Sequence, residues 1–247
     1  MIIKRSDGRF WEIDLLRGIA IILMLIFHFI YDLNHLKIIY YKLWEGPFDY
    51  ASKSIAAVFF ILVGISLTIS YNKTVGNLSL SDIRRKFAIR GLKLLFLGFI
   101  ITGVSWLIIP ERFVIFGVLH CIGISIILTI PFISYCKLNV IIGGLLVSFG
   151  FILDYLTFGF SWLIPLGFVP PRYFSIDYFP LFPWFGVILI GLALGNYLYP
   201  GGQRRFQFSI DQVEGMPKRI CFIGRHSLPI YFIHQPILFA IIFLILM

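Results

Sequence analysis

Charged side chains are scarce in this sequence. Asp, Glu, Lys and Arg make up 13% of its 247 residues, whereas hydrophobic side chains make up 59%. A soluble domain is about 25% charged, and it could not enclose this much apolar surface. The composition therefore excludes an ordinary soluble fold and indicates a protein whose surface is covered largely by lipid.

Cysteine is also rare. The three cysteines, Cys121, Cys136 and Cys221, are odd in number and widely spaced, which excludes a disulfide framework and a cysteine-based metal cluster. The sequence also lacks a phosphate-binding loop, a dinucleotide glycine motif, a zinc-protease helix motif and a serine nucleophile elbow. We therefore expect no bound metal and no chemistry based on a serine or cysteine nucleophile.

Long apolar runs are, by contrast, abundant. A helix needs about 20 mostly apolar residues to cross the hydrocarbon core of a bilayer. A shorter stretch at 158–169 predicts an interfacial or re-entrant segment, although an eighth span there stays open. We predict an all-α, polytopic membrane helix bundle that forms a single transmembrane domain over residues 1–247. Its seven spans are expected near 13–31, 54–71, 92–109, 113–133, 138–155, 179–199 and 228–247.

The net charge of +9 comes mostly from basic residues that lie between the apolar runs. With seven spans, sixteen of the 21 Lys and Arg residues, Lys4 and Arg5 among them, fall on the same side of the membrane as the N-terminus. The positive-inside rule then places the N-terminus in the cytoplasm and the C-terminus outside the plasma membrane. No basic stripe lies on a polar surface, so we expect the lipid bilayer, and no nucleic acid, as a partner. A homodimer stays open.

Five ionisable residues share one stripe of the first predicted helix. Because each residue of an α-helix turns by about 100°, residues seven or eleven apart nearly overlay, as His28 does with Arg17 and His35. Asp14 and Asp32 lie one turn from Arg17 and His28. A charge at the bilayer centre costs roughly 3 kcal/mol or more, so the stripe should face the bundle interior or a wet cavity. Asp14 and Arg17 would shape the cytoplasmic end of a substrate path, or would simply cap the helix and pair with each other.

Three stretches resemble known membrane acyltransferases. The first is EIDLLRGIAIILMLIFHFIYDL, residues 12–33, which resembles the opening helix of the heparan-α-glucosaminide N-acetyltransferase-like family. It also resembles the broader acyltransferase-3 proteins, which acylate surface glycans. The shared pattern is Asp14, then Arg17–Gly18, an apolar run and a polar residue at position 28. The other two stretches carry a weaker resemblance and are FGVLHCIGIS, residues 116–125, and IGRHSLPIYFIHQPIL, residues 223–238.

This resemblance implies a membrane acyltransferase. The donor would be acyl-coenzyme A, most simply acetyl-coenzyme A (acetyl-CoA), and the acceptor a hydroxyl or amine of a sugar or glycolipid outside. The spacing from Arg17 to His28 matches the acyltransferase-3 pattern, in which that histidine is regarded as catalytic. In the heparan branch the matching residue is typically Asn and the catalytic histidine lies in the following outer loop. This chain has no histidine at that position of the loop and offers His35 at a different spacing. His28 and His35 are therefore both candidate bases, with Asp32 as the residue that would orient or polarise the base.

A second function stays open at this point. Histidines and carboxylates inside a helix bundle also form proton relays, so the sequence is compatible with a proton-coupled small-molecule transporter. Against this alternative, no inverted repeat and no pair of broken helices occurs in the sequence.

Polar residues outside the first helix complete the predicted site. His120 and His234 fall within predicted spans and should face the bundle, either bonded to a backbone carbonyl or lining a substrate cavity. Arg172, Asp177 and Trp184 belong to an aromatic outer stretch that could hold a sugar or could form an interfacial belt.

A basic cluster opens the third predicted helix. It consists of Arg84, Arg85, Lys86 and Arg90. These side chains could clamp the phosphates of the acyl-CoA co-substrate, because Arg and Lys suit phosphate recognition. The alternative is that they only set the topology and attract anionic lipid.

Overall fold

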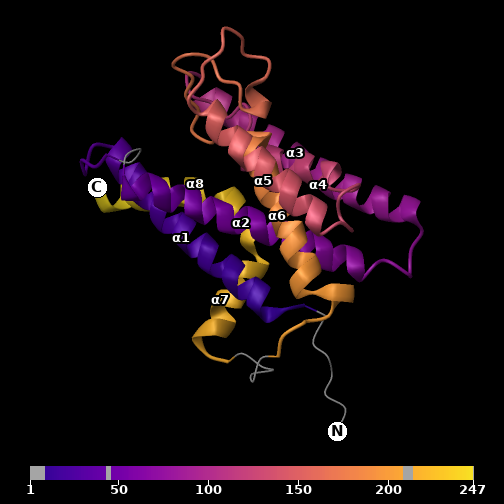
Figure 1. The fold of residues 1–247 in the computed structure, drawn as a ribbon. Helices are drawn as coiled ribbons and strands as arrows, with labels where there is room; N and C mark the ends of the chain where they lie inside the picture. Colours follow the sequence, from indigo (N-terminus) through magenta and orange to yellow (C-terminus); the bar gives the residue numbers. More distant parts are fainter. Residues whose placement is uncertain (1–8, 43–45, 208–213, 247) are drawn as a thin grey trace. The chain divides into compact units, whose positions relative to one another are not determined.

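The structure, a computed structural model, describes residues 9–42, 46–207 and 214–246. Lys4 and Arg5, which entered the charge count, lie outside these residues. The described residues form helices joined by loops, without a strand, which confirms the predicted all-α class (Figure 1). The helices are α1 (Trp11–His35), α2 (Pro47–Asn72), α3 (Leu80–Ile108), α4 (Val118–Leu128), α5 (Lys137–Leu153), η1 (Ile164–Leu166), α6 (Leu181–Leu198), η2 (Pro200–Gly202), α7 (Met216–Arg225) and α8 (Ser227–Leu246).

The helices match the predicted apolar segments. Helices α1, α2, α3, α6 and α8 are long and apolar enough to cross a bilayer, and the shorter apolar helices α4 and α5 occupy the two remaining predicted spans. The chain is therefore a multi-pass membrane protein with a helical bundle. Within 158–169 the structure has only the short 3₁₀ helix η1, so the eighth span left open by the sequence does not form there.

Two elements differ from the sequence prediction. Helix α4 begins at Val118 instead of near residue 113, because the residues before it pair with another segment: the backbone N–H of Phe179 donates to the carbonyl oxygen of Phe116 at 3.1 Å. The sequence does not predict α7, since its ten residues include Lys218 and Arg219 and are too few and too polar for a span.

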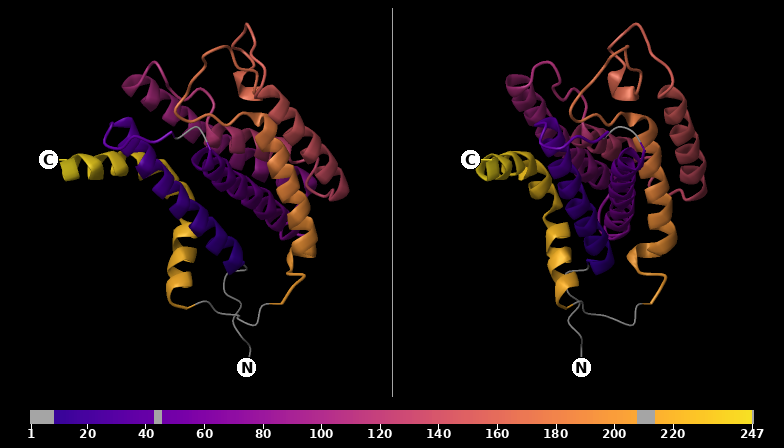
Figure 2. Two further views of the ribbon diagram at one scale, coloured as in Figure 1. Left: turned by 60° about the vertical axis from the view of Figure 1, so that its left-hand side comes forward. Right: turned by 90° about the vertical axis from the view of Figure 1, so that its left-hand side faces the viewer.

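The contacts divide the chain into two compact units, residues 1–62 with 208–247 and residues 63–207. In the first unit, α1 packs against α7 and α8 (Figure 2). Two glycines let α7 approach α1 closely. A Cβ atom on Gly224 would lie 1.9 Å from the carbonyl oxygen of Asp14, and one on Gly18 would lie 2.1 Å from that of Ile220. A larger residue at either position could not be accommodated without moving the helices apart.

In the second unit, α3 packs against α4 and α5 packs against α6. Glycines from both partners meet at each crossing. A Cβ atom on Gly91 of α3 would lie 2.6 Å from the carbonyl oxygen of Gly123 on α4, and one on Gly186 of α6 would lie 2.6 Å from that of Gly143 on α5. Small residues of this kind allow helices to pack backbone to backbone where lipid gives no hydrophobic driving force.

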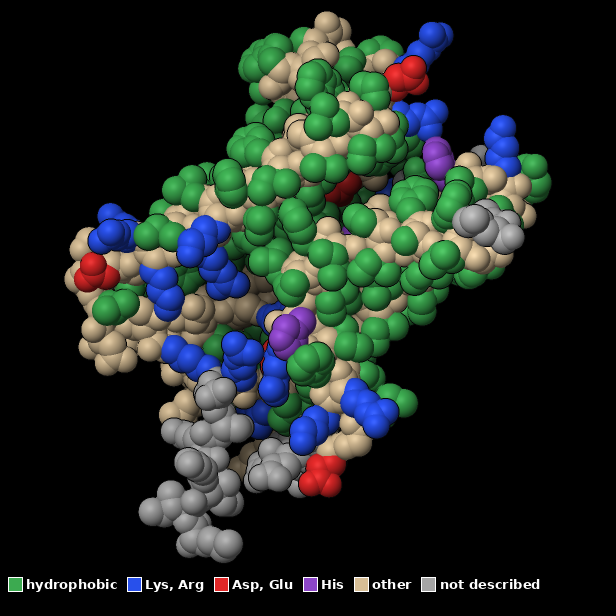
Figure 3. Space-filling view, turned by 180° about the vertical axis from the view of Figure 1, so that it is seen from behind, with side chains coloured by type: hydrophobic (Ala, Val, Ile, Leu, Met, Phe, Trp, Pro, Cys, Tyr) green, Lys and Arg blue, Asp and Glu red, His purple; other side chains and the backbone are tan. Residues whose placement is uncertain are grey.

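Hydrophobic side chains cover long stretches of the visible helix surfaces, as expected for lipid-facing helices (Figure 3). On α3, for example, Phe96, Phe99 and Trp106 are all exposed. The segment between α5 and α6 is instead fixed by polar contacts: the hydroxyl of Ser175 donates to the carbonyl oxygen of Phe113 at 2.9 Å.

Candidate active site

Helix α1 carries its polar side chains at two levels. Asp14 and Arg17 lie in its first two turns, and His28 and Asp32 lie near its end. At 1.5 Å per residue, the two levels are separated by about 20 Å along the helix axis. The helix continues without a break to His35, so the stripe predicted from the sequence does form on one helix.

The first level is an ion-pair cluster around Asp14, whose side chain is buried. Its carboxylate oxygens accept from Arg17 Nη1 at 3.3 Å and from Arg225 Nε at 3.1 Å. Two cations compensate the cost of burying this carboxylate, which would otherwise be several kcal/mol. The cluster therefore ties α7 to α1. Arg225 is a partner that the sequence does not reveal, since it lies 211 positions from Asp14, and a substrate-binding role for Asp14 and Arg17 stays a prediction.

The second level brings two histidines together from α1 and α8. The rings of His28 and His234 lie with their centroids 4.7 Å apart and their planes at 84°. His28 is half-buried and His234 is buried. His28 Nδ1 donates to the carbonyl oxygen of Met24 at 2.9 Å, and His234 Nδ1 donates to that of Tyr231 at 2.5 Å.

These two backbone bonds determine the tautomer of both rings. A carbonyl oxygen can only accept, so Nδ1 carries the proton in the neutral form of each ring, and Nε2 keeps its lone pair. Nε2 of His234 is buried and has no hydrogen-bond partner within the described part of the chain. Each imidazole therefore presents an unoccupied basic nitrogen, as a proton acceptor must.

Asp32, one turn after His28, bonds across to α8 and not to the imidazole. It is fully buried, and its Oδ1 accepts from Gln235 Nε2 at 2.7 Å. Its other oxygen, Oδ2, and Gln235 Oε1 are buried without a partner among the described residues. The sequence shows Gln235 only as a polar residue beside His234 in an apolar helix, and no spacing rule could pair it with Asp32.

The alternative base, His35, occupies a different environment. It lies at the exposed end of α1, and its ring stacks on Tyr31 with centroids 6.1 Å apart. It does not take part in the cluster of His28, Asp32, His234 and Gln235, which we call the α1–α8 polar cluster. His28 and His35 both stay candidates as the base, but only His28 has a second basic side chain beside it.

His120 belongs to the second unit and has a structural environment. It is buried, and its Nδ1 accepts from the backbone N–H of Gly117 at 3.3 Å, at the start of α4. Its Nε2 lies 3.5 Å from Thr102 Oγ1. The two bonds favour the tautomer with the proton on Nε2, which is the opposite of the tautomer of His28 and His234. The ring thus caps α4, and its predicted place in a substrate cavity stays a prediction.

The three outer residues predicted to hold a sugar differ in how they are bonded and exposed. Asp177 Oδ2 accepts from the backbone N–H of Val118 at 3.3 Å, so this carboxylate also caps α4. Arg172 is exposed, with a positive φ of 63°, and the ring of Trp184 packs against Phe179 at 5.2 Å. Only Arg172 of the three is freely presented to a ligand.

Two half-buried tyrosines, Tyr173 and Tyr178, lie close to these residues in the sequence. Burial and the neighbouring Tyr173 and Asp154 raise the pKa of Tyr178, whose hydroxyl donates to the carbonyl oxygen of Ile164 at 2.9 Å. Burial also raises the pKa of Tyr173. Both phenols therefore stay protonated at neutral pH.

The predicted phosphate clamp lies at the start of α3. Arg84, Arg85 and Arg90 are exposed, and Lys86 Nζ donates to Thr74 Oγ1 at 2.8 Å. The three arginines are free to turn toward a phosphate, which suits the negatively charged part of acyl-CoA.

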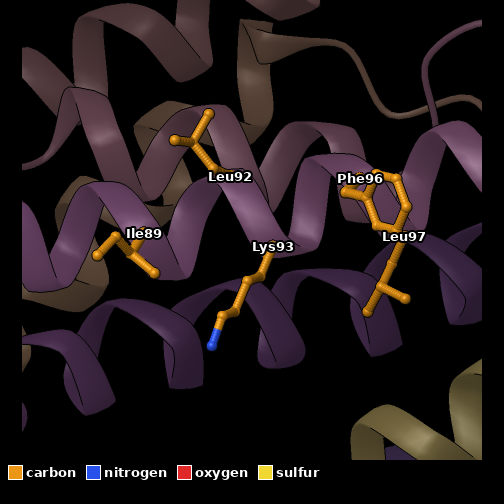
Figure 4. A pocket seen from close by; sticks show the side chains of 5 residues that line it. All are labelled: Ile89, Leu92, Lys93, Phe96 and Leu97. Carbon is orange, nitrogen blue, oxygen red and sulfur yellow. The ribbon is translucent and has the colours of Figure 1, made fainter.

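Further along α3 lies a groove of about 460 Å³, lined almost wholly by carbon (Figure 4). Its lining residues are Ile89, Leu92, Lys93, Phe96 and Leu97. Such a surface suits an acyl or lipid chain better than a polar ligand. Within the described ranges, no three His, Cys, Asp or Glu side chains come together so as to hold a metal ion.

The chain matches a known protein family. The model of the family described as "Heparan-alpha-glucosaminide N-acetyltransferase, catalytic" matches residues 9–236, which include all the candidate site residues described above. No curated protein and no solved structure matches the chain.

Proposed function

Since the chain belongs to the family of heparan-α-glucosaminide N-acetyltransferase catalytic domains, we propose that it is an acyl-CoA-dependent membrane acyltransferase. The donor is acetyl-CoA, and the acceptor is a hydroxyl or amine of a sugar or glycolipid. The N-terminus lies in the cytoplasm, where the donor is available, and the acceptor is presented at the outer face of the plasma membrane. The match to a transferase family gives no support to the proton-coupled transporter.

One observation carries the proposal. His28 lies within an apolar helix, its Nδ1 is fixed by the carbonyl oxygen of Met24, and its Nε2 makes no hydrogen bond to any described residue. A histidine held in this way is a poor structural residue, because half of its bonding capacity is unused. It is a good general base, because its free nitrogen is aimed by the helix backbone and not by a flexible side chain.

The chemistry follows from this base. His28 Nε2 takes the proton from the acceptor hydroxyl or amine as that group attacks the thioester carbonyl of the donor. The new bond forms to the acyl carbon, the carbon–sulfur bond breaks, and coenzyme A leaves as a thiolate. The exposed arginines Arg84, Arg85 and Arg90 provide charge for the donor phosphates.

Release of the coenzyme A thiol tests this function. The protein is purified in lipid nanodiscs and incubated with acetyl-CoA and a panel of neutral and amino sugars. We expect thiol release that depends on one class of acceptor. His28→Gln should lower kcat by about 10²- to 10⁴-fold, the usual contribution of a general base.

Two matched variants make the test specific. His226 also donates Nδ1 to a carbonyl oxygen four residues earlier, that of Phe222 at 2.9 Å, but it is exposed and lies outside the α1–α8 polar cluster. His226→Gln should therefore keep the wild-type rate. His35→Gln should keep most of it as well. Wild-type protein without thiol release in any condition, or His28→Gln with an unchanged rate, would contradict the proposal.

A further inference from the structure

The α1–α8 polar cluster contains a second basic nitrogen that the proposed reaction has not used. We propose that His234 is a second catalytic residue: His28 and His234 form a proton-transfer pair that carries the acceptor's proton to the departing thiolate. This inference rests on the proposed function and assigns a role to a residue of the last helix.

The first argument is geometric. The two rings are in edge-to-face contact, at 4.7 Å between centroids, although they come from helices more than 190 residues apart in sequence. Each ring has its Nδ1 engaged by its own helix, through Met24 or Tyr231. A neutral ring in this tautomer has only a lone pair at Nε2, so the two rings cannot hydrogen-bond to each other until a proton is added. Protonation of one ring would supply the N–H donor that a hydrogen bond between the two imidazoles requires.

The second argument concerns what holds His234 in place. Gln235, its neighbour on α8, donates to Asp32 on α1 at 2.7 Å. Asp32 is fully buried, so this bond is made in a dry environment and is strong relative to one exposed to water. The bond fixes α8 against α1 one residue away from the imidazole. We therefore assign Asp32 and Gln235 as positioning residues for His234.

The third argument is electrostatic. On α8 the titratable side chains are Tyr231 and His234. The facing part of α1 offers Tyr31, Asp32 and the exposed His35, whereas the cations Arg17 and Arg225 bind Asp14 at the other level of α1. Two positive charges at this separation repel each other strongly in a site of low dielectric. The pair therefore holds one proton at a time, which is the property that a relay needs.

The reaction balances with this pair. The acceptor O–H or N–H bond breaks, and its proton goes to His28 Nε2 while the acceptor atom bonds to the acyl carbon. The carbon–sulfur bond breaks, and its electron pair goes to sulfur. The proton passes from His28 Nε2 to His234 Nε2 and from there to the thiolate. The products are the acylated acceptor and the coenzyme A thiol, and both imidazoles return to their neutral form.

The kinetic test compares variants that keep size and hydrogen bonding but lose the basic nitrogen. We expect His234→Gln to lower kcat about 10²-fold with an unchanged KM for acetyl-CoA, and to remove one limb of the pH profile of kcat. His226→Gln should leave both the rate and the pH profile intact. A donor thioester whose thiol is more acidic needs no protonation on leaving. It should restore much of the rate of His234→Gln but not that of His28→Gln.

A second readout needs no substrate. Protein labelled with ¹⁵N in its histidine rings allows each of the five imidazoles to be followed by nuclear magnetic resonance as the pH is lowered. The pair predicts unprotonated Nε2 atoms on His28 and His234 at neutral pH. It also predicts that His234→Gln changes the midpoint at which His28 titrates, whereas His226→Gln does not.

The possible outcomes distinguish failure of the histidine pair from failure of the proposed function. Thiol release that needs His28 but proceeds at the wild-type rate in His234→Gln overturns the pair and leaves the proposed function standing. Independent titration of His28 and His234 overturns the pair as well. Wild-type protein without thiol release overturns the proposed function and the pair together. If His234→Gln loses activity because it fails to fold, the ¹⁵N spectrum will show this. The kinetic comparison is then repeated with His234→Asn.

Discussion

Histidine serves two different purposes in this chain, and the direction of the hydrogen bond at Nδ1 distinguishes the two kinds. In His28 and His234 this nitrogen donates to a backbone carbonyl of the same helix, so Nε2 is left basic. In His120 it accepts from the N–H of Gly117, and the proton must reside on the other nitrogen. A histidine that caps a helix contributes to folding, whereas one that presents a lone pair contributes to chemistry.

This difference gives a prediction for His120. His120→Ala removes the acceptor of a buried N–H and leaves a cavity against α3, where a Cβ on Gly98 would already lie 2.9 Å from the ring. We expect a loss of roughly 1–3 kcal/mol in the free energy of unfolding, measured by denaturation in detergent. The folded fraction should retain thiol release. A variant of unchanged stability without thiol release would instead give His120 the catalytic role.

A buried carboxylate that depends on a single amide gives the next prediction. Gln235→Leu leaves Asp32 without its bond while Asp32 remains fully buried, so we expect it to destabilise the protein by about 1–3 kcal/mol. Replacing both residues, as Asp32→Leu with Gln235→Leu, removes the unsatisfied group and should recover much of this loss. Thermal unfolding of the wild-type protein and these two variants in nanodiscs checks the order of their stabilities. Equal stability of the single and the double variant would show that the bond does not hold α8.

At the scale of single helices, close packing at glycine decides where a side chain is tolerated. Gly143 and Gly144 are adjacent on α5 and differ only in the face on which they lie. A Cβ on Gly143 would lie 2.8 Å from the carbonyl oxygen of Gly186, whereas one on Gly144 would have no neighbour within 4 Å. They form a natural pair of matched controls.

We expect opposite effects from the same substitution at these two positions. Gly143→Ala should destabilise the second unit, because α5 and α6 must separate by several tenths of an ångström. Gly144→Ala should be neutral or should stabilise by up to about 1 kcal/mol, because alanine favours a helix over glycine. Unfolding in detergent measures both. A Gly143→Ala variant as stable as Gly144→Ala would contradict the packing of α5 on α6.

The helices were predictable from the sequence to different degrees. Apolar length alone predicts α1, α2, α3, α6 and α8, because a lipid-crossing helix satisfies its backbone internally and needs no partner to be recognised. It fails for the start of α4 and for α7. In α4 the backbone bond of Phe116 to Phe179 competes with the helix, and in α7 ten residues are stabilised by docking on α1 through Gly224.

The candidate site was predictable only in part, for a related reason. The stripe of α1 follows from helical periodicity, and family resemblance singles out His28 within it. The partners of that stripe come from the opposite end of the chain, and no local rule connects His28 with His234, Asp32 with Gln235 or Asp14 with Arg225. Contacts between distant segments are decided by packing, which a single sequence does not encode in its spacing.

At the scale of the whole molecule, the number of crossings fixes the sides on which the two termini lie. Among the described residues, five helices are long and apolar enough to cross a bilayer, and α4 and α5 are shorter apolar helices. If all seven of these helices cross, the number of crossings is odd and the termini lie on opposite sides of the membrane. On that count, the bias of Lys and Arg predicts that the N-terminus and the segment between α4 and α5 lie in the cytoplasm. It predicts that the segment between α5 and α6 lies outside.

The cysteines of the chain provide a direct measurement of this arrangement. Cys136, between α4 and α5, is exposed, whereas Cys121 and Cys221 are buried. Burial also raises the pKa of Cys221, which further reduces its reactivity as a thiolate. A membrane-impermeant maleimide should therefore label Cys136 in permeabilised cells and leave it unlabelled in intact cells.

A cysteine placed in the exposed position of Ser161, in a Cys136→Ser background, should show the reverse pattern and react in intact cells. The two positions report on helix α5, because they are joined through it. If both cysteines react on the same side, α5 does not cross the membrane despite its apolar residues. The count of crossings would then be even, both termini would lie on one side, and the outer placement of Arg172 as a sugar-binding residue would fall with it.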